Sequence, residues 1–339
     1  MQFNVDIAAL AQRCVPPPVL KADDFPVREG SKRTAWAVVL AGGDGVRLRP
    51  LSRLIAGDDR PKQFCRIFGD RTLLAQTRAR LAPVVEDDHT LFVVTKSHEA
   101  YYREELNGVH SSRLIVQPKN KGTATAIAAA VLRIAQRDPD AVLAFIPSDH
   151  FYRSARHFQS SVAAAIETAA EWQESLVLLG AQATHAETEY GWIEPGATAA
   201  ADFSGNLHRV RRFWEKPSAQ LAEALHSRAC LWNTFVMAGH VNAFLRMLEN
   251  CVPCLLNALM AAQRRGRLED AYLSEALESV DFSTQVLAHS TEQVFVIRMP
   301  ASAGWSDLGV PERVMNALAD AGLEPRHHAL REGVVAAVA

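Results

Sequence analysis

Four short segments of the sequence carry residues whose types and spacing suit the binding of phosphate groups. In the first, LAGGDGVRLRP at residues 40–50, Gly42, Gly43 and Gly45 lack a Cβ, so the main chain can turn sharply and bring its N–H groups against a phosphate. Arg47 follows and can neutralise part of a polyphosphate. A tight connection after a strand is the alternative explanation, so the loop is weak evidence by itself.

The loop does not match either of two common nucleotide-binding patterns. A Walker loop ends in Gly-Lys-Ser/Thr, whereas Val46 and Arg47 follow Gly45 here. The dinucleotide fingerprint needs a glycine where this chain has Leu48, and no acidic residue closes a second strand about 20 positions later. An NAD-linked oxidoreductase is therefore disfavoured.

Two further segments add a lysine and a side-chain amide. In RPKQF, at residues 60–64, proline restricts the main chain and could fix the direction of Lys62. In VQPKNKGTATA, at residues 116–126, Gln117 ends an apolar run, and its amide offers one donor and one acceptor to a base edge. Thr123 then opens a helix, a favourable place for a phosphate. The alternatives are a solvated surface lysine and an ordinary capped helix start.

The fourth segment, IPSDH at residues 146–150, ends a strongly apolar run with Asp149. A carboxylate at this place can hold a divalent cation against phosphate oxygens, and Mg²⁺ often takes one or two carboxylates plus its substrate. An aspartate in a turn is usually a turn residue, but the glycine and arginine loop upstream favours the metal-binding role. We expect the adjacent His150 to be a structural partner rather than a general base.

The elements that must position these segments alternate between short apolar runs and helical patterns. We expect strands at 36–42, 90–95, 113–118, 141–149 and 175–181, and helices at 72–82, 101–106, 123–137 and 155–172. Such alternation indicates βαβ units, and therefore an α/β protein with a mostly parallel sheet and helices on both faces. Ligands bind beyond the carboxyl ends of the strands in such sheets, which is where the informative residues lie.

After about residue 183 the pattern changes to that of a smaller antiparallel portion. Strands are expected at 189–196 and 206–217, helices around 218–228, 241–250, 254–264 and 267–279, and a late strand at 292–300. The chain is thus expected to divide into an N-terminal arm (1–33, with one short helix near 7–13), a globular catalytic domain (34–320) and a C-terminal tail (321–339).

The composition excludes several classes of protein. Charged residues make up 22% and hydrophobic residues 48% of the chain, and 36 basic against 38 acidic residues give a net charge of −2. This balance gives no reason to expect binding to nucleic acid or to an anionic membrane. Five cysteines in so long a chain do not make a disulfide framework, and we expect Cys251 and Cys254 to be ordinary thiols rather than a zinc site. A reducing, cytoplasmic setting is the simplest interpretation.

Eight motifs occur in the order found in sugar-1-phosphate nucleotidyltransferases, which the chain therefore resembles. They are LAGGDGVRLRPLSR, PKQF, QPKNKGTA, PSDH, EYGWI, FWEKP, LWNTF and WSDLG, and they extend from about residue 35 to about residue 314. PKQF and LWN look most like mannose-1-phosphate guanylyltransferases (GDP-mannose pyrophosphorylases). The chain departs from the family pattern at KNKGTATA and at LWNTFVMAG, which lacks the glycine of the W-N-S-G form.

The resemblance implies a Rossmann-like GT-A nucleotidyltransferase core, with a mixed, mostly parallel sheet flanked by helices and a small antiparallel sugar-binding portion. It also implies which residues would hold the nucleotide, and which of those would take part in catalysis. The nucleotide-binding residues would be Leu40, Ala41, Gly42, Gly43, Gly45, Arg47, Lys62, Gln117, Gly122 and Thr123. The catalytic residues would be Arg47, Lys62 and Asp149.

The same resemblance implies a metal site and a sugar site. Asp149 and Asp307 would bind Mg²⁺, the one cofactor expected. The sugar phosphate would be faced by Gly191, Glu215, Lys216 and Asn233, with Glu215 on the sugar hydroxyls and Lys216 on the phosphate. Trp214 lies in FWEKP and Trp232 in LWNTF. An aromatic residue at a strand more often belongs to the core than stacks on a ligand, so we expect both in the core.

The implied reaction joins a sugar 1-phosphate to an NTP and releases pyrophosphate. Mannose 1-phosphate and GTP would give GDP-mannose. The alternatives are a different NTP or sugar 1-phosphate, or a catalytically silent paralogue that binds a nucleotide sugar and regulates a partner. The expected ligands are small molecules, with no nucleic acid and no membrane, and a homodimer stays open as the assembly.

Overall fold

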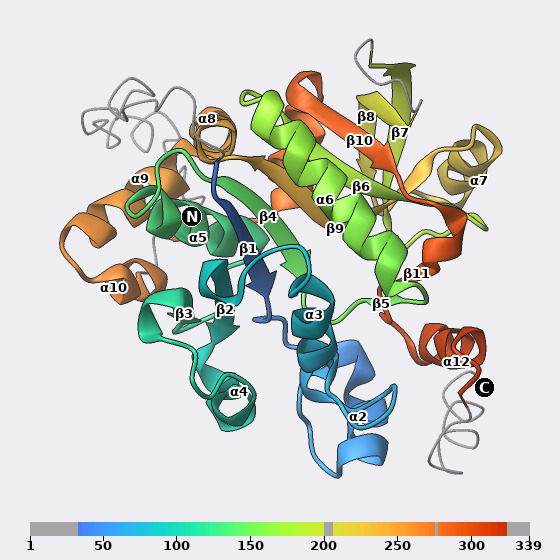
Figure 1. Cartoon of the computed structure of the whole chain (residues 1–339), viewed down its shortest axis with the longest axis horizontal. Helices are drawn as coiled ribbons and strands as arrows, with labels where there is room; N and C mark the ends of the chain where they lie inside the picture. Colours follow the sequence, from blue (N-terminus) through green and yellow to red (C-terminus); the bar gives the residue numbers. More distant parts are fainter. Residues whose placement is uncertain (1–32, 200–205, 275–276, 324–339) are drawn as a thin grey trace, which may run out of the picture.

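The computed structural model describes residues 33–199, 206–274 and 277–323. The expected N-terminal arm, with its helix near residues 7–13, and the expected C-terminal tail lie almost entirely outside these residues. Within them, one large sheet lies between two layers of helices (Figure 1). None of the helices in the described ranges has both the length and the apolar character needed to cross a membrane.

The described residues form a nine-stranded sheet in the order β3-β2-β1-β4-β9-β6-β10-β8-β7. The strands are β1 (Ala35–Leu40), β2 (Thr90–Thr95), β3 (Leu114–Gln117), β4 (Val142–Pro147), β6 (Leu176–Gln182), β7 (Gly191–Thr198), β8 (Leu207–Glu215), β9 (Leu231–His240) and β10 (Val294–Arg298). The expected strands are therefore present, with bounds that differ from those expected by at most a few residues.

The parallel half of the sheet brings the loops after β1 and β4 together. Strands β3, β2, β1 and β4 run parallel, and the last residues of β1 and β4, Leu40 and Pro147, are register partners. The chain order reverses at β1, which is the switch point where ligands bind in open α/β sheets. The glycine-rich loop and Asp149 start from these two strand ends, so the sheet itself makes them neighbours.

One central strand, β9, is absent from the sequence-based expectations. It pairs antiparallel with both β4 and β6, and nearly all of its ten residues are buried. Its sequence, LWNTFVMAGH, shows no regular alternation of polar and apolar residues, so periodicity alone does not identify it as a strand. Because of β9, more of the sheet is antiparallel than in the mostly parallel sheet expected. The same strand carries Asn233 into the site.

The two faces of the sheet are covered by different helices. From β1, Trp36 and Val38 pack in the cluster that contains helices α5 (Thr123–Ala135), α8 (Val241–Cys251) and α9 (Pro253–Arg264), whereas Ala37 and Val39 face α3 (Leu73–Leu81) and α6 (Ala155–Glu171). Successive side chains of a strand point to opposite faces, which explains this division. Figure 1 shows α6 lying across its face of the sheet.

The remaining helices are short and lie at the edges of these layers. They are α2 (Arg49–Ala56), α4 (Glu99–Glu105), α7 (Ala219–Ser227), α10 (Leu268–Leu273), α11 (Phe282–Gln285) and α12 (Pro311–Asp320). The helix expected at 267–279 is wrong in length, because α10 ends at Leu273, and Val280 lies against Gly122.

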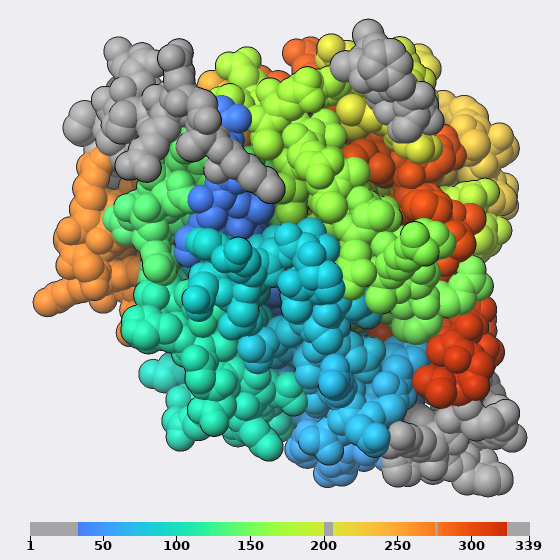
Figure 2. All heavy atoms as spheres, viewed as in Figure 1, coloured from blue at the N-terminus to red at the C-terminus, as the bar shows by residue number. Residues whose placement is uncertain are grey.

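A two-stranded sheet joins distant parts of the sequence just beyond the end of β4. Strands β5 (Phe151–Tyr152) and β11 (Trp305–Ser306) pair antiparallel. In Figures 1 and 2 the C-terminal elements accordingly lie against the segment near residue 150. Since Asp149 precedes β5 and Asp307 follows β11, this small sheet brings the two expected metal ligands close together.

Candidate active site

The loop after β1 is held in place by side chains from neighbouring segments. The side-chain amide nitrogen Nε2 of Gln63 donates to the main-chain oxygens of Ala41 (3.1 Å) and Gly43 (2.8 Å). A Cβ added to Gly42 would lie only 2.8 Å from Nε2 of Gln117. A larger residue at position 42 would therefore displace the amide of Gln117. Gln63 positions the loop; it lies within PKQF but was not among the residues predicted for the site.

A cavity of about 210 Å³ opens beside this loop. Seven of the expected nucleotide or metal ligands line it: Leu40, Gly42, Gly43, Gln117, Gly122, Thr123 and Asp149. Gln117 is 3% exposed, and its carbonyl oxygen Oε1 has no hydrogen-bond partner among the described residues. A buried acceptor without a partner is costly unless a ligand or water supplies a donor. This orphaned oxygen supports the expected contact of Gln117 with a base.

The segment before α5 is fixed by the loop that precedes α11. Gly122 has a φ of +85°, and a Cβ there would lie 2.2 Å from the main-chain oxygen of Val280. The Thr123 hydroxyl donates to Oδ2 of Asp281 (3.0 Å) and accepts from the main-chain N–H of Phe282 (2.7 Å). Because this hydroxyl is already engaged, Thr123 would meet a nucleotide through its main chain rather than its side chain.

Lys62 links the two loops that carry the expected metal ligands. Its Nζ lies 3.2 Å from Oδ2 of Asp149 and also donates to the main-chain oxygen of Asp307. Lys62 is 9% exposed, so the alternative of a solvated surface lysine is wrong. The glycine loop reaches it closely at Gly45, where φ is +56° and an added Cβ would lie 3.2 Å from the main-chain nitrogen of Lys62.

Asp307 is held by three donors on a single oxygen. Its Oδ1 accepts from the Tyr190 hydroxyl (3.0 Å), the main-chain N–H of Gly309 (2.8 Å) and Nη1 of Arg313 (2.7 Å). Burial by itself would raise the pKa of Asp307, but the positive charges of Lys62 and Arg313 outweigh it, and the pKa is lowered. Asp307 is therefore an ionised carboxylate, and its second oxygen accepts none of these three hydrogen bonds.

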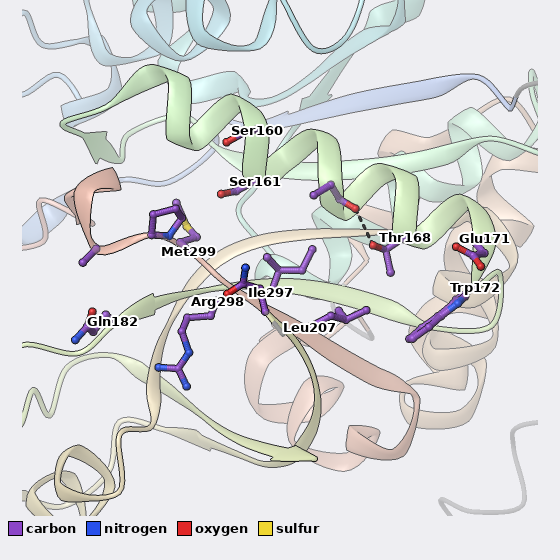
Figure 3. Close-up of a pocket in the computed structure, with 14 residues that line it drawn as sticks. Ser160, Ser161, Thr168, Glu171, Trp172, Gln182, Leu207, Ile297, Arg298 and Met299 are labelled. Atoms are coloured by element: carbon purple, nitrogen blue, oxygen red, sulfur yellow. Dashed lines mark hydrogen bonds between the residues drawn. The ribbon is translucent and has the colours of Figure 1, made fainter. Parts of the chain in front are cut away.

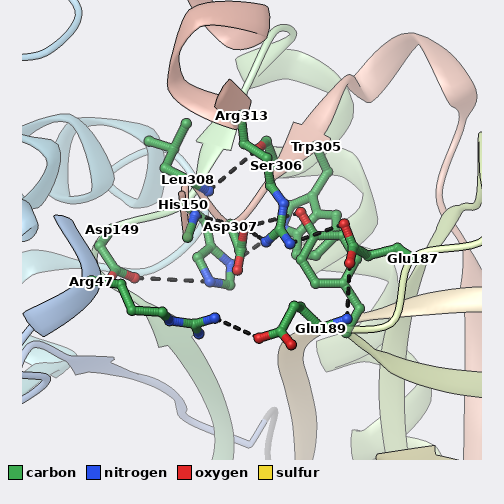
Figure 4. A network of polar contacts seen from close by, with 12 residues as sticks. Arg47, Asp149, His150, Glu187, Glu189, Trp305, Ser306, Asp307, Leu308 and Arg313 are labelled. Carbon is green, nitrogen blue, oxygen red and sulfur yellow. Dashed lines mark hydrogen bonds and ion pairs between the residues drawn. The ribbon is translucent and has the colours of Figure 1, made fainter. Parts of the chain in front are cut away.

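Arg47 extends from the glycine loop into the space beside Asp149 and Asp307, which we call the crevice (Figure 4). Its Nη1 lies 2.6 Å from Oε2 of Glu189. The main-chain N–H of Glu189 donates to the carboxylate of Glu187 (2.8 Å), and that carboxylate also pairs with Nη2 of Arg313 (2.9 Å). Figure 4 shows Arg47, Asp149 and Asp307 around one shared space. Neither Arg313 nor Glu187 was predicted from the sequence. Arg313 lies six residues beyond Asp307, in the first turn of α12, a spacing that carries no separate signal.

His150 lines the cavity as a largely buried, neutral imidazole. Its Nδ1 accepts a hydrogen bond from the indole N–H of Trp305 (3.2 Å), and the two rings meet edge to face. Burial lowers the pKa of His150 to about 4, despite the partly opposing charge of Asp149. An uncharged, hydrogen-bonded side chain of this kind fits the structural role expected for it.

Helix α3 supports the Asp149 loop from below. The Thr77 hydroxyl donates to the main-chain oxygen of Ser148 (3.1 Å), and Nη2 of Arg80 donates to that of His150 (2.9 Å). Arg80 is 9% exposed, and burial lowers its pKa to about 10. Hydrogen bonds on both sides of Asp149 fix its main chain. The sequence pattern cannot separate such a buried arginine from a solvated one on a helix.

The expected sugar-binding residues converge where β7, β8 and β9 meet. Gly191 and Glu215 are register partners, and a Cβ on Gly191 would lie 2.9 Å from Oε2 of Glu215 and 3.2 Å from Cβ of Asn233. The main-chain N–H of Lys216 donates to the main-chain oxygen of Tyr190 (3.2 Å), and Lys216 adopts a φ of +45°. Strained main chain of this kind is found mainly at functional sites.

The two tryptophans beside this area differ in burial. Trp232 is 5% exposed and meets Tyr190 (5.1 Å between ring centroids) and Trp192 (6.1 Å), so its expected place in the core is confirmed. Trp214 is partly buried and packs against the same aromatic cluster.

Glu215 is expected to make the stability of the protein depend on pH. Burial raises its pKa to about 7, with a contribution from the nearby charge of Asp281. The folded state then keeps its proton longer than the unfolded state, so stability falls as the pH rises from about 4.5 to 7. Glu215→Gln should flatten the fall of Tm across this window, measured by thermal unfolding at several pH values. Glu223→Gln, on the exposed face of α7, is the control; parallel curves for Glu215→Gln and the wild type would contradict the prediction.

The donor set fits a magnesium ion that also holds substrate oxygens. No group of three or more His, Cys, Asp or Glu side chains arranged for a metal occurs in the described residues, and Cys251 and Cys254 belong to none. Asp149 and Asp307 instead offer two carboxylates on loops that Lys62 links, through the carboxylate of Asp149 and the main-chain oxygen of Asp307. Mg²⁺ commonly takes one or two carboxylates and completes its shell with phosphates and water, so these residues suit it.

A larger hollow of about 590 Å³ lies between α6 and β10 (Figure 3), but it does not have the chemistry of the site. None of the expected ligands lines it. Hydroxyls that line it are turned back onto their own helix, as Ser161 donates to the main-chain oxygen of His157 and Thr168 to that of Ala164, both at 2.8 Å. The cavity beside the glycine loop is therefore the candidate active site.

Comparison with known proteins identifies the family and the fold of the chain. The chain matches the family described as Nucleotidyl transferase over residues 36–322. The xanthan biosynthesis protein XanB of Xanthomonas campestris pv. campestris (strain B100) is 32% identical over 302 residues, 86% of this chain and 61% of that protein. The mannose-1-phosphate guanylyltransferase of Escherichia coli (strain K12) is 31% identical over 287 residues, 81% of this chain and 58% of that protein.

A solved structure shows the same fold. The crystal structure described as a mannose-1-phosphate geranyltransferase from Thermus thermophilus aligns with a TM-score of 0.71 at 30% identity, covering 83% of this chain and 79% of that one. The chain spans about three fifths of the length of the two curated relatives named above. The resemblance inferred from the eight motifs is confirmed, and the chain belongs to the nucleotidyl transferase family.

Proposed function

We propose that this chain joins a sugar 1-phosphate to an NTP, forming a nucleotide sugar and releasing pyrophosphate. The observation that carries the proposal is the gathering of Arg47, Lys62, Asp149 and Asp307, from four separate segments, around one crevice. Both reactants are anions, so their mutual repulsion and their orientation are the main barriers. A crevice that supplies fixed cations addresses both.

In the proposed reaction a phosphate oxygen of the sugar 1-phosphate attacks the α-phosphorus, and pyrophosphate leaves on the opposite side. That oxygen is ionised at neutral pH, so no general base is needed, which agrees with a neutral His150. Arg47 and the N–H groups of the glycine loop would hold the triphosphate, and Lys62 would neutralise charge near the reacting phosphorus. Mg²⁺, held by Asp149 and Asp307, would supply further charge stabilisation.

The sugar side of the crevice suits a phosphorylated sugar. Glu215 accepts hydrogen bonds from hydroxyls, or donates one when it is protonated, and Lys216 offers a mobile positive charge to the phosphate. We propose mannose 1-phosphate and GTP as the pair, because relatives of about 30% identity are named mannose-1-phosphate guanylyltransferase. Gln117, with its orphaned buried oxygen, would meet the base.

A screen of ATP, GTP, CTP and UTP against a panel of sugar 1-phosphates, read out as pyrophosphate release, tests the proposal. We expect GTP with mannose 1-phosphate to give the highest kcat/KM. A different best pair would keep the reaction type and overturn the substrate assignment. Tight binding of a nucleotide sugar without pyrophosphate release or exchange would favour the alternative of a silent binding protein.

We also propose that the protein works in a reducing compartment, the cytoplasm. Cys65, Cys230 and Cys251 carry free thiols. Burial raises the pKa of the Cys65 and Cys230 thiols, which keeps them protonated and unreactive at neutral pH.

A further inference from the structure

Phe235 is an aromatic residue in a main-chain conformation that glycine usually adopts. Its φ is +57°, in the left-handed region, where a bulky side chain is an outlier. The cause is a bulge in β9: Asn233 is the register partner of Gly180, and Met237 that of Leu178. Four residue steps of β9 therefore lie opposite two of β6. Bulges redirect side chains and are frequent beside active sites.

The bulge is held by hydrogen bonds from the neighbouring side chains. The main-chain N–H of Phe235 donates to Oδ1 of Asn233 (3.1 Å), and that of Val236 donates to the Thr234 hydroxyl (3.3 Å). This hydroxyl, which is fully buried, donates in turn to the main-chain oxygen of Leu179 (2.7 Å). Such bonds impose the strained conformation on Phe235, so its direction is a built feature rather than a local irregularity.

This direction places Phe235 at the candidate nucleotide cavity. Phe235 lines the same space as Gln117 and Gly122, and it packs with Leu40 against the adjoining core cluster. The cavity volume of about 210 Å³ is smaller than the roughly 300–1,000 Å³ of most ligand pockets. A glycine in the same conformation would leave the volume of the phenyl ring to the cavity. The size of the cavity thus depends on this side chain.

We propose that Phe235 determines which nucleoside the site accepts. Its ring forms an apolar wall of the base cavity, and Gln117 supplies the hydrogen-bonding group there. Aromatic faces pack well against nucleobases, whereas an amide reads their edges. The hydrogen bonds around the bulge fix the main chain that carries the ring, so the wall stays at the cavity and discriminates by size and shape. This inference rests on the proposed function, since it assigns specificity within the same site.

The test measures Kd for ATP, GTP, CTP and UTP by calorimetric titration with the wild type, Phe235→Gly and Phe235→Leu. We expect the ratio of the weakest to the tightest Kd to fall by about tenfold or more in Phe235→Gly, and by less in Phe235→Leu, in line with the worth of lost apolar contacts in a pocket. Ala229→Gly is the matched control, because Ala229 also has a positive φ (53°) but does not line the cavity. It should leave the ratio unchanged.

An unchanged ratio in a folded Phe235→Gly would overturn the inference, as would a loss of discrimination among sugar 1-phosphates but not among NTPs. Should Phe235→Gly fail to fold, as judged by circular dichroism, an unchanged ratio in Phe235→Leu would overturn it. Pyrophosphate release with unaltered base discrimination would refute the role of Phe235 and leave the proposed function standing. Base-selective binding that depends on Phe235, without pyrophosphate release, would support the role of Phe235 and overturn the proposed function.

Discussion

Replacing Asp149 with alanine is expected to lower kcat by about 10²-fold or more, equivalent to about 3 kcal/mol of lost electrostatic stabilisation. Asp149 follows β4, its carboxylate faces Lys62 at 3.2 Å, and α3 fixes the main chain on both sides of it. Its removal takes away one of two candidate metal ligands and leaves Lys62 without its carboxylate partner. Steady-state pyrophosphate release at saturating substrates measures the effect.

The magnesium requirement separates a metal-binding role of Asp149 from a structural one. In the wild type, EDTA should abolish turnover and added Mg²⁺ should restore it, whereas Asp149→Ala should need a much higher Mg²⁺ concentration. Asp88→Ala, which removes a carboxylate that is 89% exposed, should behave like the wild type. Turnover that persists without any metal would remove both Asp149 and Asp307 from the proposed mechanism.

The positions of the glycine loop and Asp149 could be predicted because they depend on a general rule. Side chains after neighbouring parallel strands meet at one edge of the sheet, and the apolar runs that form β1 and β4 are plain in the sequence. Residues that join this edge from elsewhere could not be predicted in this way. Gln63 and Arg313 reach the site through loops and a short helix, and their neighbours exist only once the chain has folded.

The local conformations at the site were also beyond prediction from residue patterns. Lys216, Phe235 and Leu308 all have positive φ, which no sequence preference of lysine, phenylalanine or leucine indicates. Lys216 is itself an expected ligand, and Phe235 and Leu308 lie within two residues of the expected ligands Asn233 and Asp307. Surrounding hydrogen bonds and strand pairings impose these conformations, so the cause is tertiary. The sequence shows that LWNTFVMAG lacks the glycine of the W-N-S-G form, but it does not predict the positive φ of Phe235.

Arg47→Ala is expected to lower kcat/KM for the NTP by about 10²-fold, as is typical for removal of a group that stabilises charge in a transition state. In this structure Arg47 pairs with Glu189 at 2.6 Å, and both side chains are about half exposed. The matched control is Arg53→Ala, since Arg53, on the neighbouring helix α2, forms a similarly exposed pair with Asp59. Exposed pairs of this kind contribute little by themselves, so Arg53→Ala should leave turnover near that of the wild type.

Glu189→Gln decides between two explanations of such a loss. If Arg47 matters because it ties the glycine loop to Glu189, then Glu189→Gln breaks the same tie and should reproduce the loss. If Arg47 acts on the triphosphate, Glu189 is a competing anion, and its neutralisation should keep kcat and lower KM for the NTP. We expect the second result, because a triphosphate carries more charge than one carboxylate and offers the guanidinium a two-point contact. Equal losses in Arg47→Ala and Glu189→Gln would show that the ion pair, rather than the phosphate contact, is what the enzyme needs.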